Sequence, residues 1–341
     1  MHPALQGLLT IFIGVSGCIG YFYFSNLILD RFIFPAKGPN AGRNITRANM
    51  VRPWLFLLPA MIALGLYLAY PVIETLRLSL TERVPVPGGG PGEYDYRWVG
   101  GENYAKMMAE PKFWEAMRNN MLWLIVVPAF STAFGLLAAQ LTDRLSWGNV
   151  AKSLIFMPMA ISFVGASVIW KLVYDARPEG QEQIGILNAI ITSFGAEPQT
   201  WLTIPLWNSF FLMVVLIWIQ TGFAMVILSA ALRGIPEETV EAAIVDGANP
   251  FQIFFKIKVP QIMSTIMVVW TTITLVVLKV FDIVFAMTNG QWETQVLANY
   301  MFDKLFRAND WGIGSASAMV IMLLVTPILI WNVRNARKEM R

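Results

Sequence analysis

Seven long apolar stretches constrain this chain more than any other feature of its sequence. Each holds about 20 or more mostly apolar residues, the length that an α-helix needs to cross the roughly 30 Å hydrocarbon layer of a bilayer. Only 14% of the 341 residues are charged, whereas soluble domains carry about 25%. The sequence therefore predicts an all-α polytopic membrane protein with about seven transmembrane helices. They are Leu5–Leu29, Trp54–Leu76, Asn119–Leu141, Ser153–Tyr174, Leu206–Ser229, Ile262–Thr288 and Ile313–Val333.

The charges between these stretches are divided unevenly between the two sides of the membrane. Segments 30–53, 142–152, 230–261 and 334–341 carry 14 Lys and Arg against seven Asp and Glu. The connections on the other side carry nine Lys and Arg against 13 acids. Because basic loops are retained in the cytoplasm, we expect the N-terminus outside and the C-terminus inside.

Composition also excludes several kinds of site. The chain has one cysteine, Cys18, and one histidine, His2. A disulfide within the chain, a cysteine metal cluster, a histidine zinc site and a Ser-His-Asp triad are therefore all excluded. A net charge of +3 is too small to indicate a nucleic-acid partner. We expect no catalytic residues, no metal site and no cofactor bound by this chain.

The longest inward segment, 230–261, is too polar to span the membrane. Pro236 can begin a short helix, and the acids that follow it stabilise the positive end of the helix dipole. Gly247 is placed to end this helix, and Asn249 followed by Pro250 is typical of the start of another. The second helix is expected to show three aromatic residues on one side, Phe251, Phe254 and Phe255. The pattern predicts a helix–turn–helix on the cytoplasmic surface.

The spacing within this segment resembles the EAA loop of ABC-importer permeases. Glu241-Ala242-Ala243 is followed after three residues by Gly247, and after nine more by Ile257-x-Val259-Pro260. The departure from the family pattern is Val259, where the family has Leu. Supporting stretches are Arg52–Ala60, Tyr70-Pro71, Trp98–Met108, Val280–Gly290 and Trp311–Ala318. Gln291-Trp292 replaces the Gly-Pro usual in the family and leaves the shape of that outer turn open.

The resemblance covers Arg52 to the C-terminus. Over this range the chain is similar to the larger, maltose-type permease subunit of carbohydrate importers, in particular to α-glucoside-type subunits. It implies a permease domain over residues 52–341, with the EAA coupling loop at about 230–261. Residues 1–51 are then an additional N-terminal transmembrane helix with a basic cytoplasmic linker. The resemblance also implies a bacterial inner-membrane location, in a six-helix type I importer core.

In this family the EAA loop docks into a separate cytoplasmic ATPase, which binds ATP and Mg. The resemblance assigns ATPase coupling to Glu241, Ala242, Ala243, Asp246, Gly247, Phe251 and Pro260. It further implies a second, related permease subunit in a heterodimer, two copies of the ATPase, a periplasmic solute-binding protein and a sugar substrate. The chain itself would then have no enzymatic activity.

Polar groups inside membrane helices are costly and often mark transport paths. The spans that flank the EAA loop supply the candidates Gln220, Phe223, Thr274, Lys279 and Asp282. Lys279 and Asp282 lie three residues apart and are expected to pair on one helix face. The alternative is that these residues serve helix packing, and that Lys279 and Asp282 form a structural ion pair near the membrane interface. Trp170, Lys171 and Tyr174 are expected to form an interfacial aromatic belt.

A transporter of another class remains as the alternative. An ion-coupled secondary transporter or channel acting alone would show carboxylates or broken helices deep in several spans, together with inverted repeats. The sequence has a single Lys/Asp pair within its spans and no such repeat, which favours the importer permease.

Overall fold

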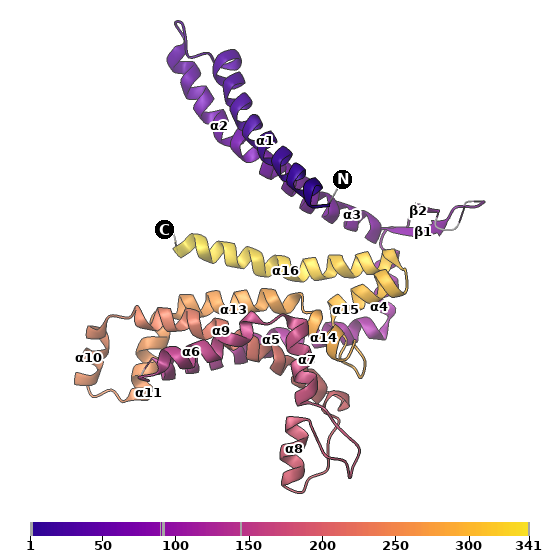
Figure 1. Cartoon of the computed structure of the whole chain (residues 1–341), viewed down its shortest axis with the longest axis vertical. Coiled ribbons are helices and arrows are strands. Elements are labelled where there is room, and N and C mark those ends of the chain that lie inside the picture. Colours follow the sequence, from indigo (N-terminus) through magenta and orange to yellow (C-terminus); the bar gives the residue numbers. More distant parts are fainter. Residues whose placement is uncertain (1–2, 89, 91–92, 144, 340–341) are drawn as a thin grey trace. The chain divides into compact units, whose positions relative to one another are not determined.

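A computed structural model describes residues 3–88, 90, 93–143 and 145–339 of the chain (Figure 1). The chain forms two compact units, Met1–Glu74 and Thr75–Arg341. The first unit contains α1 (Pro3–Ile28) and α2 (Ala41–Leu64). A π-helical turn follows each of them, Leu29–Ile33 and Gly65–Ala69, and α3 (Tyr70–Ser79) comes after the second turn.

Helix α1 is fixed to α2 by both polar and aromatic contacts. The Tyr21 hydroxyl donates to the carbonyl oxygen of Leu55 at 2.9 Å, and the rings of Phe22 and Phe56 stack at 5.0 Å. The Arg52 guanidinium donates to both carboxylate oxygens of Asp30, at 2.7 and 2.9 Å. The expected N-terminal helix is therefore present and packs on the helix that follows it.

The second unit is a helical bundle with one small sheet. The sheet is a hairpin of β1 (Thr81–Pro85) and β2 (Tyr94–Trp98), with Thr81 opposite Trp98 and Pro85 opposite Tyr94. The helices are α4 (Glu102–Ala109), α5 (Pro111–Thr142), α6 (Gly148–Phe156), α7 (Phe163–Val173), α8 (Ile186–Ser193), α9 (Trp207–Arg233), α10 (Glu237–Val245), α11 (Pro250–Gln252), α12 (Val259–Gln261), α13 (Met263–Leu278), α14 (Asp282–Met287), α15 (Leu297–Phe302) and α16 (Trp311–Glu339). Shorter 3₁₀ and π-helical turns lie at Met157–Ala160, Trp201–Thr203, Ile253–Lys258 and Asp303–Arg307. The hairpin corrects the expectation of a purely helical fold; alternating Tyr94, Tyr96 and Trp98 suit one face of a strand.

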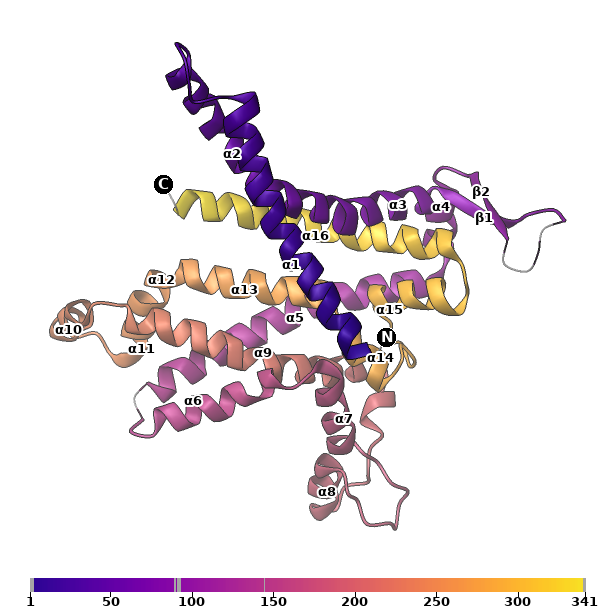
Figure 2. The same cartoon turned by 45° about the horizontal axis from the view of Figure 1, so that its top comes forward.

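Helices α5, α9 and α13 form the centre of this unit (Figures 1 and 2). Trp123, Leu216, Met225 and Ile273 are among the apolar side chains buried between them. Gly135 of α5 lies directly against α9, where an added Cβ would be 2.4 Å from the Cβ of Ala224. Small residues at such crossings let membrane helices approach closely.

The two ends of the bundle carry different segments. Helices α10 and α11 and the C-terminal end of α16 lie at one end, whereas α4, α14 and α15 lie at the other (Figures 1 and 2). The segments of this unit that are assigned to the cytoplasm by their charge are thus gathered at one end. The orientation of this bundle in a membrane stays a prediction.

Two of the expected spans are broken helices. The expected helix Ser153–Tyr174 bends by 105° between α6 and α7, at a break where the Ser162 side chain accepts a hydrogen bond from the Gly165 amide and caps α7. The expected helix Ile262–Thr288 ends instead at Leu278 and resumes as α14. Within the described residues, five helices are long and apolar enough to span a membrane. The number rises to as many as seven if each of two bent pairs is one span, Gly148–Ala160 with Phe163–Val173 and Pro250–Gln261 with Met263–Leu278.

The outer turn around Gln291-Trp292 has a shape that the sequence leaves open. Asn289, Gly290, Trp292 and Glu293 all have positive φ, between 52° and 70°. The Asn119 side chain of α5 donates to the carbonyl oxygens of Glu293 and Gln295, at 2.8 and 2.9 Å. Side-chain donors from α5 therefore hold a backbone conformation that non-glycine residues seldom adopt.

Candidate functional site

The inward segment folds as the predicted helix–turn–helix. Helix α10 begins after Pro236, which occupies the N-cap position, and carries Glu237 and Glu238 in its first turn. Gly247 follows with a φ of +81°, the left-handed conformation that glycine adopts most readily just after a helix. Ala243 is buried, whereas Glu241 and Ala242 are exposed. The EAA residues thus present two side chains to the surface and one to the packed side of the loop.

The second helix starts at Asn249, as predicted. The Asn249 side chain accepts from the Gln252 amide at 2.9 Å, and the Gln252 side chain accepts from the Asn249 amide at 2.9 Å. This reciprocal pair is a capping box, and Pro250 occupies the first helical position. The helix continues as a π-helical turn to Lys258 and, through Pro260, to the end of α12. Local capping therefore defines the loop without help from the bundle.

The tip of this loop exposes large apolar side chains next to acids. Val245 is 87% exposed and Phe251 77%, and Ile244 and Phe255 are also exposed. Glu241 and Asp246 are exposed beside them. An apolar patch rimmed by charge is typical of a protein interface. Six of the seven residues assigned to coupling lie in or between α10 and α11, whereas Pro260 lies in α12, where the loop joins α13. Helices α10 and α11 project from the end of the bundle (Figure 1).

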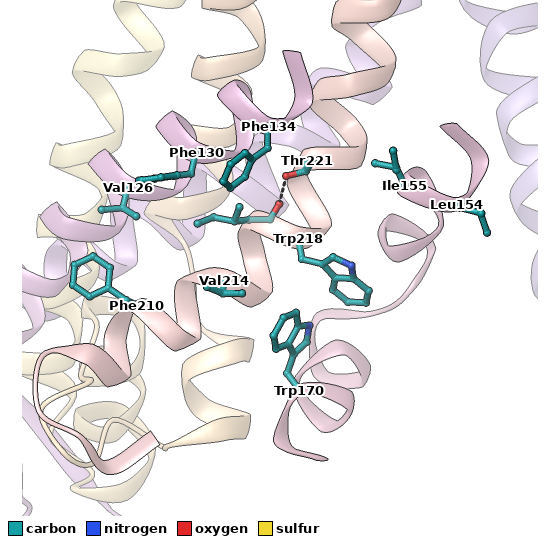
Figure 3. Close-up of a pocket in the computed structure, with 11 residues that line it drawn as sticks. Val126, Phe130, Phe134, Leu154, Ile155, Trp170, Phe210, Val214, Trp218 and Thr221 are labelled. Atoms are coloured by element: carbon teal, nitrogen blue, oxygen red, sulfur yellow. Dashed lines mark hydrogen bonds between the residues drawn. The ribbon is translucent and has the colours of Figure 1, made fainter. Parts of the chain in front are cut away.

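A second site is an aromatic cavity of about 730 Å³ between α5, α6, α7 and α9 (Figure 3). The indole rings of Trp170 and Trp218 meet edge to face, with 5.8 Å between centroids and 71° between planes. Phe130 and Phe134 line the wall formed by α5. Thr221 contributes a hydroxyl, which donates to the carbonyl oxygen of Ile217 at 2.7 Å. Aromatic faces with few polar groups are typical of small-molecule sites.

A smaller cavity of about 300 Å³ lies at the break between α13 and α14. Lys279 and Asp282 both line it, together with Phe163 of α7. Both charged residues belong to the described part of the chain, and no ion pair joins them there. The expected pairing is wrong because α13 ends at Leu278, so the two residues do not share a helix face.

The other three path candidates line neither of these cavities. Gln220 is 6% exposed and Phe223 packs against the apolar core. The Thr274 hydroxyl donates to the carbonyl oxygen of Trp270 at 2.8 Å within α13. Helices α9 and α13 both contribute residues to these cavities, but the rotation of each helix decides which of its side chains reach them.

The residues that line the aromatic cavity carry a signal in the sequence. Val214, Trp218 and Thr221 follow one another at the i, i+4, i+7 spacing of a single helix face, one position away from Gln220. The aromatic belt expected at Trp170, Lys171 and Tyr174 is wrong for two of its members. Trp170 faces the cavity, and Tyr174 is 4% exposed and donates its hydroxyl to the carbonyl oxygen of Phe211 at 2.9 Å.

In the described residues, no group of three or more His, Cys, Asp and Glu side chains is arranged to hold a metal ion. The polar groups of the two cavities are an amine, a carboxylate, a hydroxyl and two indole N–H groups. Such a set can bind and orient a polar solute.

Comparison with known proteins agrees with this geometry. Residues 111–340 match the family described as binding-protein-dependent transport system inner membrane component. The chain is 62% identical to an alpha-glucoside transport system permease protein of Rhizobium meliloti, over 99% of both chains. It is 46% identical to an osmoprotective compounds uptake permease protein of Synechocystis, over 84% of this chain and 99% of that one. A bacterial alginate ABC transporter, solved in complex with an alginate pentasaccharide-bound periplasmic protein, shares the fold with a TM-score of 0.72 at 19% identity, over 89% of this chain and 99% of the other.

Proposed function

The chain belongs to the family of binding-protein-dependent transport system inner membrane components, and we propose that it forms half of the translocation path of a bacterial ABC importer for an oligosaccharide or glycoside. The observation that carries the proposal is the 62% identity to an alpha-glucoside permease over 99% of both chains. Seven membrane crossings, with the N-terminus outside and the C-terminus inside, are part of the proposal.

The proposed assembly has four other kinds of component. A second, related permease completes a heterodimer, two copies of a cytoplasmic ATPase lie beneath it, and a periplasmic binding protein delivers the sugar. ATP and Mg bind the ATPase, so this chain contributes no catalytic residue and no cofactor site. The apolar and acidic tip formed by α10 and α11 supports the ATPase contact, because such a patch needs a partner in water.

Movement of the ATPase subunits is proposed to act through α10. A short helix with defined caps can transmit a push as a rigid body. The exposed Glu241 carboxylate can accept a charge-assisted hydrogen bond from the ATPase, and Ala242 beside it allows close approach. The exposed Phe251 and Val245 supply apolar contact area.

The aromatic cavity is proposed as this subunit's part of the sugar path. Trp170 and Trp218 offer two ring faces to the apolar side of a pyranose, and Thr221 offers a hydroxyl. Lys279 and Asp282 at the helix break are proposed to meet sugar hydroxyls farther along the path, because both are exposed and line the smaller cavity.

Uptake by membrane vesicles tests the function. Vesicles from cells that contain this chain and its partner proteins should accumulate a labelled α-glucoside only when ATP is inside and the binding protein is outside. The tagged chain should co-purify with ATPase activity. Uptake driven by an ion gradient through the purified chain alone would instead support the stand-alone secondary transporter.

Replacing Trp218 with alanine is expected to lower the uptake rate about tenfold, which corresponds to about 1.4 kcal/mol of lost binding to the path. ATP hydrolysis stimulated by the sugar-loaded binding protein should persist, since the ATPase contact is untouched. Trp207 of the same helix is 60% exposed and lies outside the cavity, so Trp207→Ala is the matched control. Equal losses in both variants would exclude the cavity from the path.

A further inference from the structure

An ionic cluster joins three helices at the end of the bundle that carries α10. Asp143 is the C-cap residue of α5. Its carboxylate accepts hydrogen bonds from Lys152 of α6, from the Ser229 hydroxyl of α9 at 3.0 Å and from the Arg233 guanidinium of α9 at 3.1 Å. The Lys152 ammonium also donates to the Ser229 hydroxyl at 2.7 Å. One carboxylate therefore connects α5, α6 and α9.

The cluster is partly withdrawn from solvent. The side chain of Lys152 is 14% exposed, that of Asp143 is 21% exposed and Ser229 is buried, whereas the Arg233 side chain is 59% exposed. Burial raises the pKa of Asp143, but the hydrogen bonds from Lys152, Ser229 and Arg233 outweigh burial and leave the pKa below its ordinary value. The carboxylate is therefore charged at neutral pH, and the surrounding protein screens it less than water would.

Arg233 is also the last residue of α9 before the coupling loop. Only Gly234, Ile235 and Pro236 separate it from α10. The Gly234 amide donates to the carbonyl oxygens of Ala230 and Ala231, at 3.2 and 3.1 Å. The start of the connection is therefore hydrogen-bonded to the last turn of α9. A displacement of α10 can therefore reach Arg233 through only three intervening residues.

Helix α6 is not continuous with α7, because a bend of 105° at Ile161 and Ser162 separates the two helices. The C-terminal part of α6 lies against α9, where an added Cβ on Gly222 would be 2.7 Å from the carbonyl oxygen of Ile155. In the middle of α6, Lys152 adds charge-assisted hydrogen bonds, which fix donor and acceptor positions. The Asp143 carboxylate therefore helps to fix α6 relative to α5 and α9.

We propose that Asp143, Lys152 and Arg233 make the ends of α5, α6 and α9 move as one unit when α10 is displaced. Asp143 is the positioning residue of this linkage, because it is the acceptor that the other members share. The inference rests on the proposed function, since it assumes that an ATPase moves α10. It adds specific residues that connect the coupling loop, through α9, to α5 and α6, which also line the aromatic cavity.

The test measures sugar transported per ATP hydrolysed by the complete transporter in proteoliposomes. Asp143→Asn keeps the shape of the side chain and removes its charge. We expect this ratio to fall about tenfold, within the usual range of coupling between distant sites, while ATP hydrolysis continues. Asp143→Glu keeps the charge that Lys152 and Arg233 share and should retain most of the ratio. The control is Glu82→Gln, since Glu82 also pairs with two cations, Arg97 and Lys106, but in the outer hairpin.

An unchanged ratio in Asp143→Asn would overturn the linkage, as would a parallel fall of uptake and hydrolysis, which indicates a merely structural role. Ser229→Ala removes the hydrogen bonds that its hydroxyl makes with Asp143, Lys152 and Arg233 and keeps all three charges, and it should lower the ratio about threefold. If Asp143→Asn does not assemble, an unchanged ratio in Ser229→Ala overturns the inference. Absence of ATP-dependent uptake in the unmodified transporter would instead contradict the proposed function.

Discussion

Replacing Glu241 with lysine is expected to abolish ATP-dependent uptake. Glu241 lies on the exposed side of α10, where the proposed ATPase contact would pair its carboxylate with a donor. Lysine places a cation against that donor, and an unpaired charge within an interface costs several kcal/mol, on the order of 2–5. Uptake by vesicles and the amount of ATPase that co-purifies with the tagged chain should both fall to background.

The matched control is Glu179→Lys. It makes the same change of charge at an exposed position of the loop between α7 and α8, which faces away from the cytoplasm in the predicted topology. This control should keep uptake and ATPase co-purification. Undiminished uptake and assembly in Glu241→Lys would show that α10 is not the coupling element.

Local patterns made the coupling loop predictable from the sequence. The cap at Asn249, the proline at 250 and the positive φ of Gly247 all follow from preferences that act within a few residues. The structure bears out each of them. The partner that the loop would meet does not follow from local preferences, and it comes from the resemblance of Glu241 to Pro260 to the EAA pattern.

The broken helices were harder to predict from the sequence, because the length of an apolar stretch does not indicate whether the helix bends. Pro158 and Ser162 together mark the break within residues 153–174. The apolar composition of this range as a whole nevertheless fits a continuous span. At Lys279 the helix ends after an unbroken apolar run. The contacts that separate α13 from α14 are tertiary, so hydrophobic periodicity could not reveal them.

The lining of the aromatic cavity depends on helix rotation, which long-range packing sets. Gln220 and Thr221 are adjacent in the sequence, but Gln220 is buried and Thr221 lines the cavity. A helix that is apolar all round has no amphipathic face from which its rotation can be inferred. The close approach of α5 to α9 at Gly135 is part of the packing that fixes this rotation.

Replacing Gly135 with valine is accordingly expected to destabilise the centre of the bundle. An added Cβ would lie 2.4 Å from the Cβ of Ala224 and 2.8 Å from the backbone nitrogen of Met225. Backbone cannot rotate away as a flexible side chain can, so the helices must separate. Overpacking costs about 1–3 kcal/mol, and the upper end of this range corresponds to about 5–10 °C in Tm. Thermal unfolding of the purified chain in detergent measures the shift.

Three further variants decide whether the crossing itself is responsible. Ala133 lies on the exposed side of α5, so Ala133→Val carries the same β-branched penalty in the same helix and should shift Tm by less than about 2 °C. Gly135→Ala should be milder than Gly135→Val, and combining it with Ala224→Gly removes the Cβ contact and should recover part of the loss. Full recovery is not expected, because the Met225 amide stays in place. If Gly135→Val matched Ala133→Val in Tm, the helices would have to cross elsewhere, and Val214, Trp218 and Thr221 would lose the rotation that directs them into the cavity.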